Sequence, residues 1–538
     1  MSTSTSLTSA STETVPTVTG RGMTMSDMVA RYARTMPDAV AFRDGDATST
    51  WLGFHDRVTR IANALSERGV GVGDRVAVLG LNSVELVEAT VAALRVGAVC
   101  VPLNFRLVAD EIAYQLVDSG AVAIVVDAAL APVVAGARRN PDVPTRTVLV
   151  MRGESEHGES LDAATAAASP DYVEVDVNDY EPAFIMYTSG TTGWPKGAVL
   201  THRNLLLHSF SNMVHAGVEA GERIGLSGAP FFHIAGVSGL HITMTAGGTT
   251  VLSPSGGFDP AAMVDLLERE RVTSCFFVPA QWAAIVAVPG VKERRLALRK
   301  ASWGAAPAST TLLRTIIETF PEAELSTAFG QTECSPVTCI LKGEDAIRKI
   351  GSVGTPMLNV EVRVVDDETN DVPRGEVGEI VYRGPLVMSG YWNKPKETAE
   401  AFRGGWFHSG DLVREDEDGY FYVVDRKKDM IISGGENIYC AEVENVIAGH
   451  PKVGEVALIG VPDTRWGESP LAIIAPRDPA DPPTAADIDQ WCREHLAAYK
   501  RPRDVALVEA LPRNPSGKVL KTSLRTEYGA ASAGDSAV

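Results

Sequence analysis

Apolar and polar positions alternate along the first part of the chain in a pattern typical of α/β proteins. Residues 75–79 (RVAVL) form a short apolar run that predicts a buried strand, and residues 84–95 have the spacing of an amphipathic helix that ends at Gly97. Two further apolar runs, at residues 98–102 and 121–126, predict additional strands. Strands separated by helices of this length predict parallel βαβ units with right-handed crossovers.

The same alternation is found at the start and in the middle of the chain. Residues 25–34 have helical spacing, with Ser26 as the expected cap. An apolar strand at residues 184–187 runs into a turn rich in Gly and Thr. The next predicted elements are strands at residues 248–252 and 274–278, with a helix at residues 261–270 between them.

The pattern changes from about Leu341 onwards. Short alternating segments divided by turns predict a small antiparallel β unit there. A charge run at residues 425–429 (DRKKD) separates two apolar strands and falls where a domain boundary is expected. Beyond this run, helices at residues 441–448 and 485–497 and a strand at residues 455–461 predict a compact α+β module.

Composition restricts the partners that the protein can have. The 538 residues are too many for one compact core, so more than one domain is expected. The formal net charge of −19 disfavours nucleic acid and anionic membrane surfaces, because both require clustered positive charge. No apolar run reaches the ~18–20 residues that span a bilayer. Monomer and homodimer both stay open.

Cysteine usage and the first residues predict a cytoplasmic protein. The six cysteines are sparse and form no CxxC pair, so neither a disulfide framework nor a zinc site is indicated. The Ser/Thr-rich N-terminus lacks the basic and apolar parts of a secretory signal. We therefore expect a disordered tail at this end of the chain.

The most informative segment is residues 187–197, YTSGTTGWPKG, which follows a predicted strand. Glycines let backbone N–H groups approach a polyphosphate, hydroxyls can donate to phosphate oxygens, and a lysine supplies positive charge. The G-x-x-x-x-G-K-[ST] order is missing. A plain surface turn is the alternative, but the preceding strand and the following lysine favour phosphate. The candidate residues are Thr188, Ser189, Gly190, Thr191, Thr192, Gly193 and Lys196.

The segment resembles the signature loop of the adenylate-forming superfamily, which includes acyl-CoA and aryl-CoA synthetases, adenylation domains of peptide synthetases and firefly luciferase. Other motifs of the superfamily follow in the same order between about Trp51 and Lys521. The resemblance implies a carboxylic acid:CoA ligase of the acyl-CoA synthetase, fatty-acid-CoA ligase-like branch. Such an enzyme uses ATP, Mg²⁺ and coenzyme A, and makes an acyl-adenylate before the thioester.

The resemblance also implies an α/β fold. A large N-terminal domain would contain two doubly wound βαβ subdomains and a small β-barrel-like subdomain, and a small mobile α+β C-terminal domain would follow. The expected boundaries are a disordered tail at 1–24, the N-terminal domain at 25–425, a hinge at 426–428, the C-terminal domain at 429–525 and a flexible tail at 526–538.

Three segments resemble nucleotide-binding motifs of the superfamily. SWGAAP at residues 302–307 resembles the adenine-binding turn, and FGQTE at 329–333 a motif that contacts adenine, phosphate and metal. Glu333 would hold Mg²⁺, a hard cation that prefers carboxylate and phosphate oxygens. In SGD, Asp411 would accept hydrogen bonds from the ribose hydroxyls, with Arg426 as a second contact. The implied adenine- and phosphate-binding residues are Gly304, Ala305, Ala306, Pro307, Phe329, Gly330 and Thr332.

The C-terminal part resembles the superfamily's mobile domain. Lys518, in PSGK, would be the catalytic lysine, because a cation aimed at developing negative charge stabilises the transition state. Lys428 matches the position about which the domain rotates. Residues expected to bind coenzyme A are Gly434, Gly435, Tyr499 and Arg501. Together with Lys518, the implied catalytic residues are Thr188, Glu333 and His233.

The expected acyl pocket is apolar and aromatic. His233 in PFFHIAG is either a gate of this pocket or a structural histidine. This tract has no Asp to pair with an α-amino group, so a hydrophobic carboxylic acid is expected rather than an amino acid. The lining residues are expected to be Phe232, His233, Ala235, Gly236, Val278, Trp282, Trp303 and Ala328.

Three residues depart from the superfamily's usual pattern: Trp194 in the phosphate loop, Trp303 beside the adenine turn, and Cys440 where proline is common. One alternative is therefore an enzyme specialised for thioester formation from a supplied acyl-adenylate, with adenylation impaired by the two tryptophans. A non-catalytic nucleotide- or acyl-binding protein is the alternative of another class. Loading onto a carrier protein is disfavoured, because no carrier domain follows.

Overall fold

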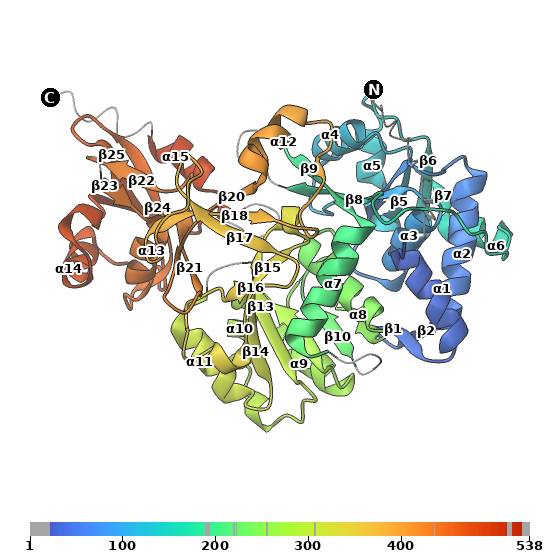
Figure 1. Cartoon of the computed structure of the whole chain (residues 1–538), viewed down its shortest axis with the longest axis horizontal. Helices are drawn as coiled ribbons and strands as arrows, with labels where there is room; N and C mark the ends of the chain where they lie inside the picture. Colours follow the sequence, from blue (N-terminus) through green and yellow to red (C-terminus); the bar gives the residue numbers. More distant parts are fainter. Residues whose placement is uncertain are drawn as a thin grey trace, which may run out of the picture.

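The structure, a computed structural model, has four parts, each built around one β-sheet (Figure 1). Two α/β units lie beside each other, a small antiparallel sheet lies between them and the last part of the chain, and the C-terminal module forms one end of the molecule. The predicted α/β fold class, with a large N-terminal part and a small C-terminal one, is confirmed. The described residues are 22–188, 194–218, 221, 223–253, 255, 257–305, 308–434, 436–513 and 519–529.

In the described residues, eight strands form the first sheet, in the order β19-β9-β8-β4-β3-β5-β6-β7. Its centre is parallel, whereas β9 and β19 are antiparallel additions at one edge. Its strands are β3 (Arg75–Leu79), β4 (Val99–Pro102), β5 (Ala123–Asp127), β6 (Thr147–Met151), β7 (Glu159–Ser160), β8 (Pro182–Thr188), β9 (Lys196–Thr201) and β19 (Gly390–Tyr391). Its helices are α1 (Met25–Thr35), α2 (Trp51–Glu67), α3 (Val84–Arg95), α4 (Ala109–Ser119), α5 (Ala131–Ala137) and α6 (Leu161–Ala167).

The second sheet has the order β16-β15-β14-β13-β12-β10-β11-β1-β2 within the described ranges. β1 comes from the N-terminal part of the chain and pairs in parallel with β11, so the two α/β units share one chain segment. Its strands are β1 (Val40–Asp44), β2 (Ala47–Thr50), β10 (Ile224–Ser227), β11 (Thr249–Val251), β12 (Ser274–Phe277), β13 (Lys300–Gly304), β14 (Glu324–Gly330), β15 (Val337–Leu341) and β16 (Thr355–Pro356). Its helices are α7 (His202–Ala216), α8 (Ile234–Thr245), α9 (Pro260–Arg269), α10 (Pro279–Val286) and α11 (Thr310–Thr319).

The third sheet is antiparallel and open, in the order β17-β18-β20-β21, where a barrel-like unit was expected. Its strands are β17 (Glu361–Val365), β18 (Val377–Arg383), β20 (Phe407–Glu415) and β21 (Phe421–Arg426), and α12 (Pro395–Ala401) lies before β20. The fourth sheet contains β22 (Ile431–Ser433), β23 (Glu436–Ile438), β24 (Val453–Asp463), β25 (Gly467–Pro476) and β26 (Asp504–Leu507). Its helices are α13 (Cys440–Ala448), α14 (Ala485–His495) and α15 (Lys521–Gly529).

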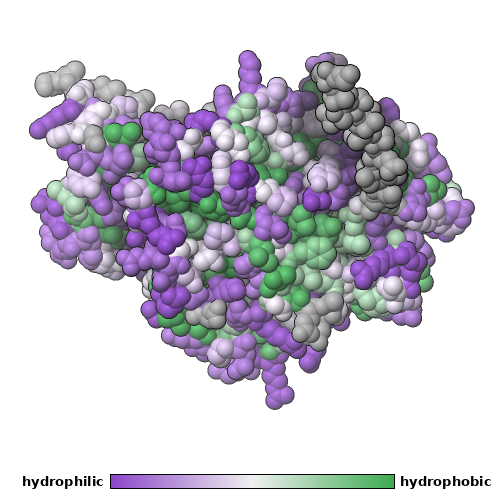
Figure 2. Space-filling view, viewed as in Figure 1, coloured by the Kyte–Doolittle hydropathy of each residue, from purple (hydrophilic) through white to green (hydrophobic). Residues whose placement is uncertain are grey.

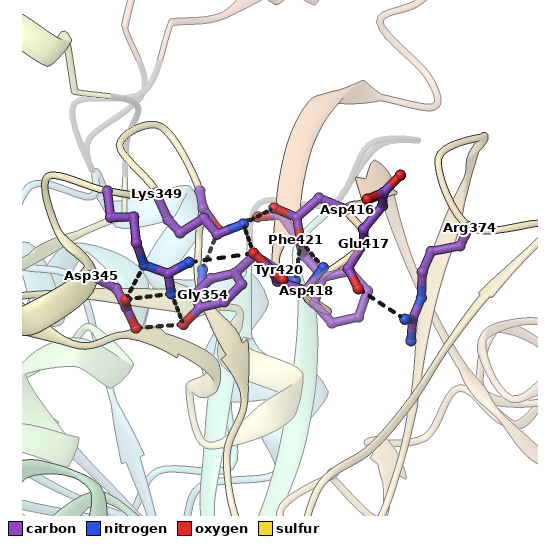
Figure 3. Close-up of polar contacts among 11 residues, drawn as sticks. Asp345, Lys349, Gly354, Arg374, Asp416, Glu417, Asp418, Tyr420 and Phe421 are labelled. Carbon is purple, nitrogen blue, oxygen red and sulfur yellow. Dashed lines mark hydrogen bonds and ion pairs between the residues drawn. The ribbon is translucent and has the colours of Figure 1, made fainter.

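Charged and aromatic groups join the turn between β20 and β21 to the segment between β15 and β16 (Figure 3). The ammonium of Lys349 lies 2.7 Å from a carboxylate oxygen of Asp416 and 2.6 Å from one of Asp418. The Tyr420 hydroxyl donates to Asp345. Hydrogen bonds to these two aspartates raise the pKa of Lys349, so the ammonium stays charged. These contacts fix the third sheet against the second.

The cap of α1 differs from the prediction. Thr24, not Ser26, is the N-cap: its hydroxyl accepts from the Asp27 N–H at 3.2 Å, and the Asp27 carboxylate accepts from the Thr24 N–H at 2.9 Å. Ser26 instead accepts a hydrogen bond from Arg95 at 2.9 Å. The reciprocal pair satisfies two N–H groups at once, which a serine inside the first turn cannot do.

Hydrophilic residues cover much of the surface in the orientation of Figure 2, and hydrophobic ones gather near its centre, over α7. Phe210 and Val214 of α7 are exposed, as is Leu358, whose N–H donates to His215 of the same helix at 3.1 Å. Within the described ranges, no helix combines the length and apolar character needed to cross a bilayer. A homodimer stays a prediction.

Candidate active site

The predicted phosphate loop has a β-hairpin as its stem. β8 ends at Thr188 and β9 begins at Lys196, and these two residues are direct cross-strand partners. The Thr188 hydroxyl donates to the Lys196 carbonyl at 3.3 Å. The stem holds both ends of the loop side by side. The predicted phosphate ligands Ser189, Gly190, Thr191, Thr192 and Gly193 lie outside the described residues.

Glu333 and Lys196 meet on one side chain, that of Tyr391. Glu333 is 8% exposed and lies in a 3₁₀ turn that follows β14. Its carboxylate accepts a hydrogen bond of 2.8 Å from the Tyr391 hydroxyl. The Lys196 ammonium lies 4.4 Å from the centroid of the Tyr391 ring. The structure therefore brings together two predicted ligands, one for phosphate and one for metal, that are distant in the sequence.

The predicted adenine-binding residues lie at the carboxyl ends of two adjacent parallel strands, β13 and β14. A Cβ at Gly304 would lie 2.2 Å from the Ala328 carbonyl oxygen, and one at Gly330 would lie 2.1 Å from that of Pro336, so both positions require glycine. Ala305 has a φ of 66°, which is uncommon for a residue with a Cβ. Ligands of open α/β sheets bind at such strand ends. Ala306 and Pro307 lie outside the described residues.

Asp411 and Arg426, the predicted ribose contacts, are cross-strand partners in the third sheet. The Arg426 guanidinium lies 2.5 Å from an Asp411 carboxylate oxygen, and Asp411 is only 3% exposed. Burial, and then the negative charges of Glu333 and Asp411, raise the pKa of the Cys334 thiol well above its usual range. Both carboxylates therefore lie close enough to this buried thiol to raise its pKa, so Glu333 and Asp411 belong to the same region of the structure.

The donor set around Glu333 fits Mg²⁺ bound together with nucleotide. Among the described residues, no group of three His, Cys, Asp or Glu side chains is arranged to hold a metal ion. Mg²⁺ is ordinarily held by one or two carboxylates together with substrate phosphates, rather than by a cage of protein ligands. A single carboxylate beside the stem of the predicted phosphate loop matches that requirement.

The expected acyl-pocket residues fall into two groups. The ring of Phe232 contacts those of Phe105 and His233, with centroids 5.3 and 4.3 Å away, at the N-terminus of α8. Burial, together with the smaller effect of the nearby Arg106, lowers the pKa of His233 to about 4, so this imidazole is neutral at physiological pH. Ala235 and Gly236 continue this group into α8.

Trp282 and Trp303 belong to a different environment. Both lie in the hydrophobic core between the second sheet and helices α9, α10 and α11. Trp282 is fully buried, and its indole N–H donates to the Ser302 carbonyl at 3.0 Å. Trp303 and Ala301 both belong to this core, whereas Ala328 packs against a different hydrophobic cluster. The structure therefore does not group the two tryptophans with Phe232. Val278 is the N-cap residue of α10.

Trp194 stacks on Tyr114 of α4, with ring centroids 4.6 Å apart, and is 61% exposed. The Tyr114 hydroxyl also donates to the Pro195 carbonyl at 2.9 Å. These contacts anchor the C-terminal side of the loop to α4. Because most of the indole faces solvent, its bulk is placed outside the stem.

The candidate coenzyme A residues lie in the C-terminal module. Gly434 has a φ of 61°, and a Cβ there would lie 2.6 Å from the Trp466 ring, so glycine is required. Tyr499 is exposed, and the Arg501 guanidinium donates to the Leu496 carbonyl at 3.2 Å. Gly435 and Lys518 lie outside the described residues.

The segment around Lys428 connects the third sheet to this module. Burial lowers the pKa of Lys428. The Asp425 carboxylate, at the end of β21, accepts a hydrogen bond from the N–H of Cys440, the first residue of α13. A proline at position 440 has no N–H to donate. The departure from proline therefore has a structural reason: it allows a contact across the predicted hinge.

His208 on α7 supports the segment that follows Glu333. The Val337 N–H donates to its Nε2 at 3.3 Å, and burial, with a smaller effect of His241, lowers the pKa of His208 to about 3.

This lowered pKa makes the stability of the protein depend on pH. The contribution of neutral His208 to stability is fully present above pH 6.5, the usual pKa of histidine, and is lost as the pH falls below that value, because only the unfolded chain takes up the proton. The free energy of unfolding should fall by about 1.4 kcal/mol more in the parent than in His208→Gln between about pH 7.5 and 5.5.

Urea unfolding at several pH values measures this difference. His157→Gln, a change at a partly exposed histidine, is the matched control and should follow the parent. If the free energy of unfolding had the same pH dependence in the parent and in His208→Gln, the lowered pKa assigned to His208 would be contradicted.

Two residues of this site were not predicted from the sequence. Tyr391 contacts both Lys196 and Glu333, and Asp118 of α4 accepts a hydrogen bond of 2.8 Å from the Tyr187 hydroxyl and pairs with Lys394 at 3.0 Å. The sequence signal for both is weak. Residues 390–394 (GYWNK) join two aromatic residues to a lysine after an apolar stretch, but nothing local links them to the phosphate loop.

Two family models and several known proteins match most of the chain. Residues 29–392 match the family described as AMP-binding enzyme, and residues 442–518 match the AMP-binding enzyme C-terminal domain. A feruloyl-CoA synthase from an Amycolatopsis species is 42% identical over 504 residues, which cover 93% of this chain and 98% of that protein. The long-chain-fatty-acid–CoA ligase FadD13 of Mycobacterium tuberculosis is 38% identical over 488 residues, 90% of this chain and 94% of that protein.

A solved structure is similar over almost the whole chain. It is that of the O-succinylbenzoate coenzyme A synthetase MenE from Bacillus subtilis, in complex with ATP and a magnesium ion. The TM-score is 0.83, the sequence identity is 30%, and the match covers 93% of this chain and 99% of that one.

Proposed function

The chain belongs to the AMP-binding enzyme family, and from this premise we propose that it carries out both half-reactions of a carboxylic acid:CoA ligase on a hydrophobic acid. In the first, a carboxylate oxygen attacks the α-phosphorus of ATP, and pyrophosphate leaves. In the second, the thiol sulfur of coenzyme A attacks the carbonyl carbon of the acyl-adenylate, and AMP leaves. The contacts of Tyr391 with Lys196 and Glu333, beside the glycine-lined ends of β13 and β14, carry this proposal.

Each predicted site residue has a separate role in the first half-reaction. The stem residues Thr188 and Lys196 would bind phosphate, Glu333 would hold Mg²⁺, and Asp411 with Arg426 would bind the ribose. Bound there, Mg²⁺ would supply positive charge to offset the charge that develops on the phosphates. Lys518 is proposed to stabilise the negative charge that grows between the carboxylate and the α-phosphate.

The C-terminal module is proposed to serve both half-reactions by rotating about Lys428, a hinge motion between two states. One face would present Lys518, and the other would present Gly434 and Gly435 to the pantetheine. Tyr499 and Arg501 would contact the nucleotide of coenzyme A. The exposed, stacked position of Trp194 and the core position of Trp303 support a complete ligase over an enzyme with impaired adenylation.

A panel of acids assayed for AMP release with coenzyme A tests the proposal. It should include hydroxycinnamic, aryl, medium-chain and long-chain acids, because the named relatives act on acids of different shape. AMP release that depends on one class of acid is expected. Thioester formation only from supplied acyl-adenylate would favour the half-reaction alternative. ATP binding without hydroxamate-trapped adenylate from any acid would favour the binding protein.

A further inference from the structure

Tyr391 is held rigidly at the edge of the first sheet. β19 pairs antiparallel with β9, with Tyr391 opposite Ala198, and the Trp392 N–H donates to the Gly197 carbonyl at 2.8 Å. On the other side, the Tyr391 N–H donates to the Thr398 hydroxyl at 2.9 Å. These hydrogen bonds fix the backbone from which the phenol extends.

A second set of contacts ties the following residues to the phosphate-loop stem. The Trp392 indole N–H donates to the Asp118 carbonyl at 3.1 Å, and the Lys394 ammonium lies 3.0 Å from an Asp118 carboxylate oxygen. The other carboxylate oxygen of Asp118 accepts from the Tyr187 hydroxyl at 2.8 Å. Because Tyr187 precedes Thr188 in β8, the stem and the residues that follow Tyr391 are fixed to one common residue, Asp118.

The two groups that meet on Tyr391 have opposite charges. Lys196 faces the ring and Glu333 accepts from the hydroxyl, yet the described side chains show no ion pair between Lys196 and Glu333. A direct pair would neutralise both charges and withdraw them from phosphate and metal. A cation–π contact is weaker than such a pair, so a nucleotide phosphate can draw the ammonium away, while the charge-assisted hydrogen bond from the Tyr391 hydroxyl to the carboxylate stays in place.

We propose that Tyr391 is a positioning residue of the metal and phosphate site: its hydroxyl orients the Glu333 carboxylate for a divalent cation, and its ring keeps the Lys196 ammonium apart from that carboxylate. This inference rests on the proposed function, because it presumes that Glu333 binds the metal of a metal–nucleotide complex. Partners that orient a metal ligand typically change metal affinity about 10–100-fold when removed.

The Tyr391→Phe variant separates the two roles, since it keeps the ring and removes the hydroxyl. Binding of Mn²⁺ with a non-hydrolysable ATP analogue, measured by electron paramagnetic resonance, should weaken about tenfold, and the Mg²⁺ concentration for half-maximal ATP–pyrophosphate exchange should rise by a similar factor. Excess Mg²⁺ should restore most of the rate. Tyr391→Leu, which also lacks the ring, should raise the KM for ATP as well.

Tyr32→Phe is the matched control. It removes a hydroxyl that donates a hydrogen bond of the same length, 2.8 Å, to the Thr245 carbonyl elsewhere in the large domain. It should leave Mn²⁺ binding unchanged. In the double variant Glu333→Gln with Tyr391→Phe, exchange should be no slower than with Glu333→Gln alone, because Tyr391 acts through Glu333.

The outcomes distinguish this inference from the proposed function. Parent-like Mn²⁺ affinity and Mg²⁺ dependence in Tyr391→Phe would overturn the role of Tyr391 while leaving the ligase assignment intact. If the parent binds Mn²⁺ with the analogue but activates no acid, the proposed function fails, and the binding titration still decides the role of Tyr391.

Discussion

The Glu333→Gln variant is expected to lose about 10²- to 10³-fold in acid-dependent ATP–pyrophosphate exchange. Glutamine keeps the shape of the side chain and an amide oxygen that can accept from the Tyr391 hydroxyl, so the turn around it should persist. The lost property is the negative charge that would hold Mg²⁺ beside the phosphates. Thioester formation from preformed acyl-adenylate should be affected much less, because pyrophosphate has already left.

Glu88→Gln is the matched control for this change. Glu88 is also a buried carboxylate of the large domain, paired with Arg57 at 2.7 Å, and burial raises its pKa to about 7. Exchange should be unaffected there, since that carboxylate contacts none of the predicted ligands. Equal losses in the two variants would show that the effect of Glu333→Gln is one of folding and not of metal binding.

The strands and helices of the first sheet could be predicted because their signal is local. The apolar run at Arg75–Leu79 and the helical pattern at Val84–Arg95 were predicted with the observed bounds, since each is buried along its own length. The pairing of β1 with β11 could not be predicted, because it joins segments far apart in the chain. Its backbone hydrogen bonds do not require particular residues in either segment.

The candidate site divides in the same way. Lys196 was predicted from the glycine- and hydroxyl-rich segment around it, and Glu333 and Asp411 from short motifs that resemble those of the superfamily. Tyr391 was missed, because its role depends on the edge pairing of a two-residue strand with β9. A tyrosine after a glycine carries no sign of such a contact.

The direction of side chains along a strand explains why the sequence alone could not show on which face of the sheet Trp303 lies. Trp303 and Ala328 lie on neighbouring strands, yet alternate residues of a strand point to opposite faces, and the registers place the tryptophan in the helix-covered core. Both residues are apolar, so hydropathy alone could not assign the face.

The Lys518→Ala variant is expected to lose adenylation by about 10²- to 10³-fold, measured as ATP–pyrophosphate exchange and hydroxamate-trapped adenylate. In the proposed mechanism this ammonium acts where charge grows as the carboxylate attacks phosphorus, so it stabilises the transition state more than the bound substrates. The KM for ATP and the Mg²⁺ dependence should therefore change little, in contrast to the Tyr391 and Glu333 variants.

Thioester formation from supplied acyl-adenylate should survive in Lys518→Ala, because the second half-reaction is assigned to the other face of the same module. Lys452→Ala is the control: this lysine belongs to the same module and pairs with Asp481 at 2.6 Å on the surface, so both half-reactions should continue. Equal loss of the two half-reactions in Lys518→Ala would contradict the use of two faces. A selective loss would mean that one rotating module supplies the charge for adenylation and then withdraws it to admit the thiol.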